Sequence, residues 1–230
     1  MKRKKIAVIG NGMVGNKFCE KIRQKDPTLE IIVFNEEPIR AYDRVHLTDY
    51  FKNKTLEELY LKENNWYAEN NIKIHLNDPI KSVNTIKKTI TSIKGIDTTY
   101  DYLVFATGSA AFVPSIPGTD KEGVFMYRTI EDLDLIRSYA KSVRKGTVMG
   151  GGLLGLEAAK ALLDLGIKES SVIEFAPRLM PRQIDDRASA LLQAKLKQLG
   201  VECLLQKSTA RLLGNNKLTG IEFSDGSKID

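Results

Sequence analysis

The chain has 230 residues, of which 42% are hydrophobic, and this is enough for one large or two small domains with buried cores. Lysine and arginine number 35 against 29 acidic residues, so the net charge is +6, and no basic stripe with aromatic partners points to nucleic acid as a partner. The chain has no apolar run of about 18 residues, and its basic start leads into only a brief apolar stretch, so we expect neither a membrane span nor a signal peptide.

The two cysteines, Cys19 and Cys203, lie far apart in the sequence. Two cysteines without a partner nearby in the sequence fit a reducing cytoplasm, where we expect the protein to reside. Since the chain has no C-x-x-C pair and only two histidines, we expect no zinc site, iron–sulfur cluster or other metal site within it.

The first predicted elements form a β-α-β unit. Residues 5–9 are a short apolar run, which is typical of a strand buried in a parallel sheet. The glycine motif of residues 10–15 follows at once, and residues 17–25 have helical spacing. Residues 30–34 are the second predicted strand, and Glu36 comes just after it.

The middle of the chain predicts a helix followed by strands. Thr55 is a candidate N-cap for a helix over residues 55–70, and residues 72–96 have the pattern of short alternating strands. Residues 100–105 predict another buried strand, which ends in Ala106-Thr107-Gly108 and leads into a proline-containing linker.

The β-α-β pattern returns about 140 positions after its first appearance. It comprises a strand over residues 146–149, a glycine motif over 150–155, a helix over 156–163 and a strand over 171–175 with Glu174 near its end. Further predictions are a helix opened by a capping box at Thr129 and reaching about residue 143, a helix over 187–199 and a hairpin over 217–230.

Two β-α-β openings of the same design predict an α/β fold with two Rossmann-like, three-layer domains, each built on a parallel central sheet. We expect residues 1–118 to form the first domain, as an incomplete one, and residues 119–230 to form the second.

The glycine motifs predict two sites for the diphosphate of a dinucleotide. A glycine turn between strand and helix lets the backbone approach the phosphates, and the helix N-terminus directs N–H groups and partial positive charge at them. Gly10 would allow the tight turn, Gly12 the close approach and Gly15 the packing of helix on strand. An acid about 20 residues later binds ribose hydroxyls, and Glu36 and Glu174 lie 21 and 19 residues after the last glycine of their motifs.

A single glycine motif would also fit an ordinary turn, but each motif here has a preceding strand, a following helix and an acid at the right distance. Other candidates are weaker by spacing alone. Arg44 and Arg128 can pair with phosphate, although lone arginines are usually solvated. Glu157, which we place in the first helical turn, fits there simply because the helix dipole favours a carboxylate.

With Ala106-Thr107-Gly108 at the end of a strand that begins after Tyr100-Asp101, the chain resembles the two-dinucleotide-binding flavoproteins of the glutathione-reductase-like superfamily. The absence of a C-x-x-C or C-x4-C pair favours the branch without a redox disulfide. Within it, the strings around residues 9–15, 36–47, 127–133, 150–158 and 174–182 are most similar to the large subunits of assimilatory NAD(P)H nitrite reductases.

This resemblance implies two cofactors and a set of contacts for each. FAD would be held by Gly10, Gly12, Met13, Val14, Gly15, Glu36, Arg44, Ile80, Ala106, Thr107, Gly108 and Arg128. NAD(P)H would be held by Gly150, Gly152, Leu154, Gly155, Glu157 and Glu174. The Glu174 carboxylate favours NADH, but Arg178 and Arg182 lie close enough in sequence that NADPH stays open. The first domain would then bind FAD and the second NAD(P)H.

The resemblance also implies hydride transfer from the nicotinamide to the flavin, for which we expect no side-chain acid or base. Electrons would continue to a downstream acceptor, either a sirohaem and iron–sulfur domain or a small redox protein. Two alternatives remain open: a stand-alone rubredoxin or ferredoxin reductase, and a nucleotide-binding piece without turnover. The family's third motif, a Gly-Asp pair near the flavin, has no counterpart before Asp230. We therefore expect the chain to be the N-terminal piece of a longer reductase, with a second domain that lacks its last strand.

Overall fold

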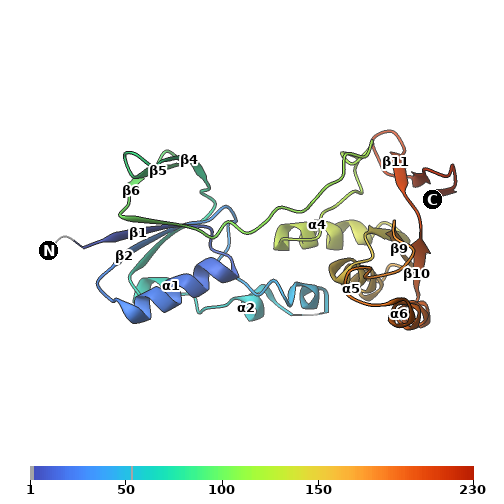
Figure 1. Ribbon diagram of the computed structural model, residues 1–230, viewed down its shortest axis with the longest axis horizontal. Coiled ribbons are helices and arrows are strands. Elements are labelled where there is room, and N and C mark those ends of the chain that lie inside the picture. Colours follow the sequence, from blue (N-terminus) through green and yellow to red (C-terminus); the bar gives the residue numbers. More distant parts are fainter. Residues whose placement is uncertain (1–2, 53) are drawn as a thin grey trace. The chain divides into compact units, whose positions relative to one another are not determined.

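Figure 1 shows the computed structural model of the chain, which describes residues 3–52 and 54–230. The chain divides into two compact units. Unit 1 comprises Met1–His46 and Thr55–Ala110, and unit 2 comprises Leu47–Lys54 and Ala111–Asp230.

Unit 1 has a four-stranded parallel sheet with the strand order β3-β2-β1-β7. Its strands are β1 (Lys5–Ile9), β2 (Glu30–Phe34), β3 (Ile72–His75) and β7 (Tyr102–Phe105). The helices of this unit are α1 (Met13–Lys25), α2 (Leu56–Leu59) and α3 (Trp66–Glu69), and a three-stranded antiparallel sheet is formed by β4 (Ile80–Asn84), β5 (Thr89–Ser92) and β6 (Asp97–Thr99).

The parallel sheet of unit 1 is the middle of three layers, as Figure 1 shows. On one face Ile6 and Val8 pack with Cys19 of α1. On the other face Ala7 and Ile9 pack with Ile90 of β5. Successive strand residues point to opposite faces, so β1 is apolar on both sides because both sides are covered.

Unit 2 repeats this design around a three-stranded parallel sheet with the order β10-β9-β8. Its strands are β8 (Lys145–Met149), β9 (Glu169–Glu174) and β10 (Val201–Leu205). The other elements are η1 (Leu47–Lys52), α4 (Ile130–Ala140), α5 (Leu153–Asp164), α6 (Asp186–Gln198) and an antiparallel sheet of β11 (Thr209–Leu213), β12 (Gly220–Phe223) and β13 (Lys228–Ile229).

The two faces of the unit 2 sheet are also covered by different layers. Val172 of β9 packs with Leu156 of α5 and Leu196 of α6. The next residue, Ile173, packs with Phe223 of β12. The predicted α/β class with two three-layer units and parallel central sheets is therefore confirmed.

The helix predicted over residues 55–70 is wrong in extent. Thr55 does form a capping box with Glu58, but α2 ends at Leu59 and a separate turn forms α3. Between them Tyr60 is extended and forms a β-bridge with Tyr42, while the N–H of Leu61 donates to the carbonyl of Ala41 at 3.0 Å. Pairing with a distant segment replaces the helical hydrogen bonds here, because a short helix gains little from propensity alone.

The capping box predicted at Thr129 is confirmed. The Thr129 hydroxyl accepts from the N–H of Asp132 at 3.1 Å, and the Asp132 carboxylate accepts from the N–H of Thr129 at 2.8 Å. The helix that it opens ends at Ala140, slightly earlier than expected. Among the described residues, no helix has the length and apolar character needed to cross a membrane.

Candidate functional site

The first glycine turn joins β1 to α1 and is held tightly against β2 and β7. The N–H of Gly10 donates to the carbonyl of Phe34 at 2.8 Å, and Gly10 has a φ of +101°. A Cβ on Gly10 would lie 2.3 Å from the carbonyl oxygen of Ala106. Only glycine therefore fits this position, on both conformational and steric grounds.

The remaining two glycines of this turn have opposite surroundings. A Cβ on Gly15 would lie 2.1 Å from the carbonyl oxygen of Gly10, so the absence of a side chain lets the helix pack on the turn. A Cβ on Gly12 would meet nothing within 4 Å, so this glycine borders open space. Close packing at one glycine and free approach at the other are what a diphosphate cradle requires.

The second glycine turn, between β8 and α5, has the same geometry. The N–H of Gly150 donates to the carbonyl of Ile173 at 2.8 Å, and its φ is +111°. A Cβ on Gly155 would lie 1.9 Å from the carbonyl oxygen of Gly150, whereas one on Gly152 would meet nothing within 4 Å. The chain therefore carries two cradles of one design.

Both helix N-termini fit an anionic ligand. Gly12 and Gly152 are the N-cap residues of α1 and α5, and neither cap makes a side-chain hydrogen bond. No acidic residue lies in the first turn of either helix. The first N–H groups and the positive end of each helix dipole are thus left for an outside anion, as a diphosphate needs.

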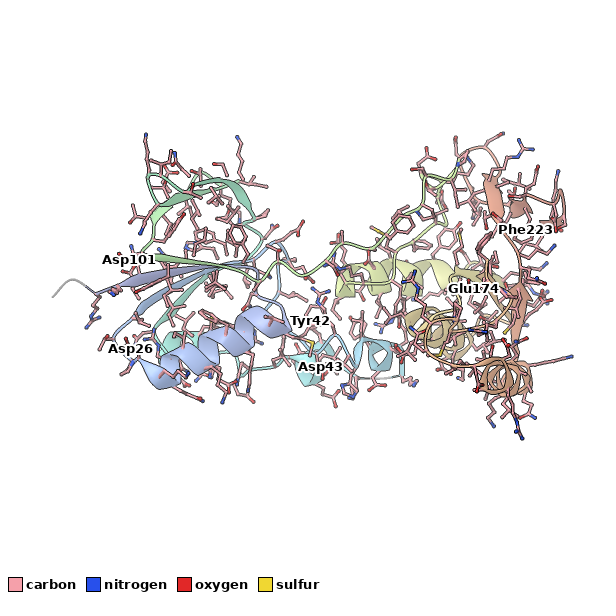
Figure 2. The ribbon with its side chains drawn as sticks, in the orientation of Figure 1. Asp26, Tyr42, Asp43, Asp101, Glu174 and Phe223 are labelled. Atoms are coloured by element: carbon pink, nitrogen blue, oxygen red, sulfur yellow. The ribbon has the colours of Figure 1, made fainter. Side chains whose placement is uncertain are left out.

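The acid predicted in unit 2 lies at the end of β9, where Figure 2 labels it, and contacts its glycine turn directly. Glu174 accepts hydrogen bonds from the N–H of Gly151 at 2.7 Å and from the N–H of Ala176 at 2.8 Å. A Cβ on Gly151 would lie 3.0 Å from Glu174 Oε2 and 2.8 Å from Leu179 Cδ2. The carboxylate is therefore fixed beside the cradle.

The equivalent position in unit 1 is Asn35 and not Glu36. The N–H of Asn11 donates to Asn35 Oδ1 at 3.0 Å, just as the N–H of Gly151 donates to Glu174. Asn35 is buried, and Glu36 follows it as an exposed residue. Asn35 lies 20 residues after Gly15, and Glu174 lies 19 residues after Gly155. The spacing of equivalent positions thus differs by one between the units, so a count from the glycines does not distinguish Asn35 from Glu36.

Ala106 lies at the same sheet edge as the first cradle. Its N–H donates to the carbonyl of Ile9 at 2.8 Å, and Thr107 and Gly108 follow it directly. Ile80 opens β4 and packs against the core cluster that contains Phe34. These residues and Glu36 are therefore grouped in unit 1 around the carboxyl ends of β1, β2 and β7.

The predicted arginines belong to different units. Arg44 in unit 1 pairs with Glu37, whose other carboxylate oxygen accepts from the Tyr42 hydroxyl at 2.8 Å. Arg128 in unit 2 precedes α4, and its N–H donates to Asp132 at 3.1 Å.

Glu157 is not in the first turn of α5, as we expected, but one turn further along, because α5 begins at Leu153. It lies near Tyr127, whose hydroxyl donates to Thr48 at 2.9 Å. Burial, and to a smaller extent the Glu157 charge, raise the pKa of Tyr127.

The first turns of the two helices hold the remaining predicted residues. The first turn of α1 contains Met13 and Val14, and the first turn of α5 contains Leu154. The side chains of Val14 and Leu154 are exposed.

The sequence of the chain matches the family of pyridine nucleotide-disulphide oxidoreductases over residues 4–230. The chain belongs to this family. Its two cysteines are both free, with Cys19 buried in α1 of unit 1 and Cys203 in β10 of unit 2.

Among curated members of the family, the chain is similar to nitrite reductase large subunits. It is 43% identical over 234 residues to the nitrite reductase (NADH) large subunit of Escherichia coli, which covers 100% of the chain and 28% of the relative. It is 42% identical over 226 residues to the nitrite reductase [NAD(P)H] large subunit of Klebsiella oxytoca, which covers 97% of the chain and 24% of the relative. The chain thus spans about a quarter of the length of these relatives.

The fold of this family member is also that of a solved ferredoxin reductase from Rhodopseudomonas palustris. The TM-score is 0.92 at 22% identity, over 99% of the chain and 56% of the reductase. This likeness supports the two three-layer units described above.

The structure adds residues around the first cradle that sequence patterns did not indicate. Asn11, Asn16 and Tyr67 are all buried, and the side-chain amides of both asparagines donate to the Tyr67 hydroxyl behind the turn. Asn11 and Asn16 lie inside and just after the glycine motif, so their polarity was visible in the sequence. Tyr67 comes from a segment 51 to 56 residues away, and no local pattern links it to the turn.

Proposed function

We propose that this chain binds FAD in unit 1 and NAD(P)H in unit 2 and serves the transfer of hydride from the nicotinamide to the flavin. The observation that carries the proposal is the pair of cradles, in which Gly12 and Gly152 border open space at uncapped helix N-termini. Membership of the pyridine nucleotide-disulphide oxidoreductase family also supports the binding of these two cofactors.

In unit 1 the diphosphate of FAD would meet the N–H groups of residues 12–15, that is Gly12, Met13, Val14 and Gly15, beyond the turn made by Gly10. Glu36 is exposed at the end of β2, where its carboxylate can accept hydrogen bonds from ribose hydroxyls. Ala106, Thr107 and Gly108 would line the FAD site, Ile80 would lie by the adenine, and Arg44 would contact the flavin nucleotide. The contact of Arg128 with the flavin nucleotide stays a prediction, because Arg128 belongs to unit 2.

In unit 2 the diphosphate of NAD(P)H would meet the N–H groups of Gly152, Leu154 and Gly155, beyond the turn made by Gly150. The Glu174 carboxylate lies beside this cradle, where it would bind the ribose and favour NADH by repelling a 2′-phosphate. Glu157 would approach the carboxamide of the nicotinamide.

The bound cofactors supply the redox chemistry, since a reduced nicotinamide donates hydride and a flavin accepts it. The chain's own residues bind and orient the two molecules and exclude water from them. No side chain needs to act as an acid or base for this step.

At the level of the whole protein, we propose that the chain is the N-terminal dehydrogenase segment of a cytoplasmic assimilatory nitrite reductase. The identity to the large subunits of Escherichia coli and Klebsiella oxytoca supports this assignment. A sirohaem and iron–sulfur domain would then be the acceptor, and a small redox protein such as rubredoxin is the alternative.

The test is anaerobic titration of the FAD-reconstituted chain with NADH, followed by the flavin absorbance near ~450 nm. We expect a yellow protein that bleaches on addition of NADH. Gly152→Ala is the matched variant, since it should keep FAD but need more NADH for bleaching. A chain that stays colourless after incubation with FAD would refute the proposal. Faster reoxidation by rubredoxin than by a purified sirohaem domain would favour the alternative acceptor.

A further inference from the structure

A buried polar cluster lies directly behind the first cradle. The Tyr67 hydroxyl is 2.9 Å from Asn11 Nδ2, 3.1 Å from Asn11 Oδ1 and 2.9 Å from Asn16 Nδ2. The exposed fractions of Asn11, Asn16 and Tyr67 are 2%, 2% and 3%. We call these three residues the tyrosine cluster.

The Tyr67 hydroxyl is a shared hydrogen-bond partner of both asparagine side chains, and the backbone of Ala41 also bonds to it. An amide or hydroxyl that is buried without a partner destabilises a protein. Burial raises the pKa of Tyr67, so its hydroxyl keeps its proton and can both donate and accept. The one hydroxyl therefore serves both asparagine side chains.

Asn11 is also held through its backbone. Its N–H donates to Asn35 Oδ1 at 3.0 Å, and Asn35 Nδ2 donates to the carbonyls of Glu37 and Ile39 at 3.0 and 3.1 Å. The residue between Gly10 and Gly12 is thus fixed at its backbone and at its side chain. This fixes the direction of the peptide groups on either side of it.

The second cradle shows that a glycine turn does not need this cluster in order to form. Gly151 and Leu156 follow Gly150 and Gly155 as Asn11 and Asn16 follow Gly10 and Gly15. Gly151 has no side chain and lies against Leu179, while Leu156 is buried in the apolar core of unit 2. A buried cluster of polar side chains from the turn is therefore specific to unit 1, whereas the second turn is held by the bond from the N–H of Gly151 to Glu174.

We propose that Tyr67 is a positioning residue for the diphosphate of FAD, and that it acts by holding Asn11 and Asn16 so that the N–H groups of the first cradle converge on the phosphates. This inference rests on the proposed binding of FAD to unit 1. A preformed cradle lowers the ordering cost of binding, so loss of the hydroxyl should weaken FAD binding.

The experiment compares Tyr67→Phe with the wild-type chain by titration with FAD, using the quenching of flavin fluorescence. Tyr60→Phe is the control, since the Tyr60 ring stacks under the Arg40 guanidinium in the same unit and lies outside the cluster. We expect Tyr67→Phe to raise the dissociation constant for FAD about tenfold, as for a lost buried hydrogen bond, and Tyr60→Phe to change it less than about twofold. The dissociation constant for NADH should stay within about twofold in both variants, because the second cradle has its own support.

A double-variant cycle separates positioning from mere support of the fold. The variant Asn11→Gly with Asn16→Leu gives the first cradle the residues of the second, and adding Tyr67→Phe to it should then change FAD affinity less than about twofold. The ³¹P resonances of bound FAD give a second readout, which should shift in Tyr67→Phe but not in Tyr60→Phe. If Tyr67→Phe does not fold, Asn16→Leu alone carries the test, with an expected loss of about threefold or more.

The outcomes distinguish this inference from the proposed function. A wild-type chain without FAD affinity would refute the proposed function and the inference together. A wild-type chain that binds FAD, with a Tyr67→Phe variant of equal affinity and unchanged ³¹P resonances, would refute the inference alone.

Discussion

Glu174 Oε2 accepts a hydrogen bond from the backbone N–H of Gly151 at 2.7 Å, and this bond ties the end of β9 to the second cradle. In unit 1 the neutral side chain of Asn35 makes the equivalent bond to Asn11 at 3.0 Å. The two cradles therefore share a backbone design but differ in the charge next to it. A carboxylate at this position disfavours an additional phosphate, whereas an amide does not.

The first prediction concerns this carboxylate. Glu174→Ala removes two hydrogen bonds to backbone N–H groups and the negative charge beside the cradle. We expect NADH to bind about tenfold more weakly and NADPH to lose less affinity, so that the preference shifts towards NADPH. Titration with both nucleotides measures this, with Glu169→Ala at the opposite end of β9 as the control. An unchanged preference would contradict the role assigned to Glu174.

The second prediction separates the two functions of glycine in one turn. Gly155→Ala would place its methyl group 1.9 Å from the carbonyl oxygen of Gly150. The clash should cost about 1–3 kcal/mol, which exceeds the roughly 1 kcal/mol that alanine gains over glycine inside a helix. We expect a lower unfolding midpoint.

Gly152→Ala is the matched variant, because its methyl group would meet nothing within 4 Å and its φ of −80° suits alanine. The loss of a glycine N-cap should cost less than about 1 kcal/mol. NADH affinity should fall about tenfold or more, because the methyl group would occupy the space that we propose for the diphosphate. Thermal unfolding and NADH titration of both variants check the contrast. Equal effects of the two substitutions on stability would be inconsistent with this geometry.

The third prediction is a pH dependence of stability from His75. Its ring stacks on Phe34 with centroids 4.6 Å apart, and burial, followed by the charge of Lys73, lowers its pKa below the ordinary value of 6.5. Above about pH 6.5 the ring is neutral in both the folded and the unfolded chain, so it adds no pH dependence. As the pH falls below this value, the unfolded chain takes up the proton first, and the free energy of unfolding decreases.

The variant His75→Phe keeps a ring on Phe34 and removes the titrating group. We therefore expect the wild-type chain to lose stability relative to this variant as the pH falls below about 6.5. Chemical unfolding at several pH values measures the difference. Parallel curves for the two proteins would show that the charging of His75 does not matter.

The fourth prediction concerns cysteine reactivity. Burial raises the pKa of Cys19 to about 12, and its side chain is fully buried in α1. Since the thiolate is the reactive form, iodoacetamide at about pH 8 should leave Cys19 unmodified in the folded protein. Cys203 is partly accessible and should react first. Mass spectrometry of the labelled peptides with and without denaturant tests the order, and rapid native labelling of Cys19 would contradict its burial.

Much of the fold was predictable from local patterns. The apolar run of β1, the glycine motif and the helical spacing of α1 are contiguous in sequence, and they recur around β8 and α5. Thr129 illustrates the same point for a cap, because its partner Asp132 lies only three positions away. Features of this kind depend on neighbours along the chain, so their residue types reveal them.

Other features required contacts between distant segments. The break between α2 and α3 arises from the bridge between Tyr42 and Tyr60, and local helix-forming residues carry no information about it. The placement of Tyr67 behind Asn11 likewise joins residues 56 positions apart.

By itself, the sequence determined that two strand–glycine–helix cradles exist and which glycines form them, because steric limits on φ and on Cβ contacts act within a few residues. Only the tertiary structure decided the contacts beside each cradle: the Tyr67 hydroxyl on Asn11 and Asn16 at the first, and the bond of Glu174 to Gly151 with Leu179 against the turn at the second. The physical reason is that hydrogen bonds and packing between distant segments depend on where the folded chain brings them together, and spacing along the chain does not specify those meetings.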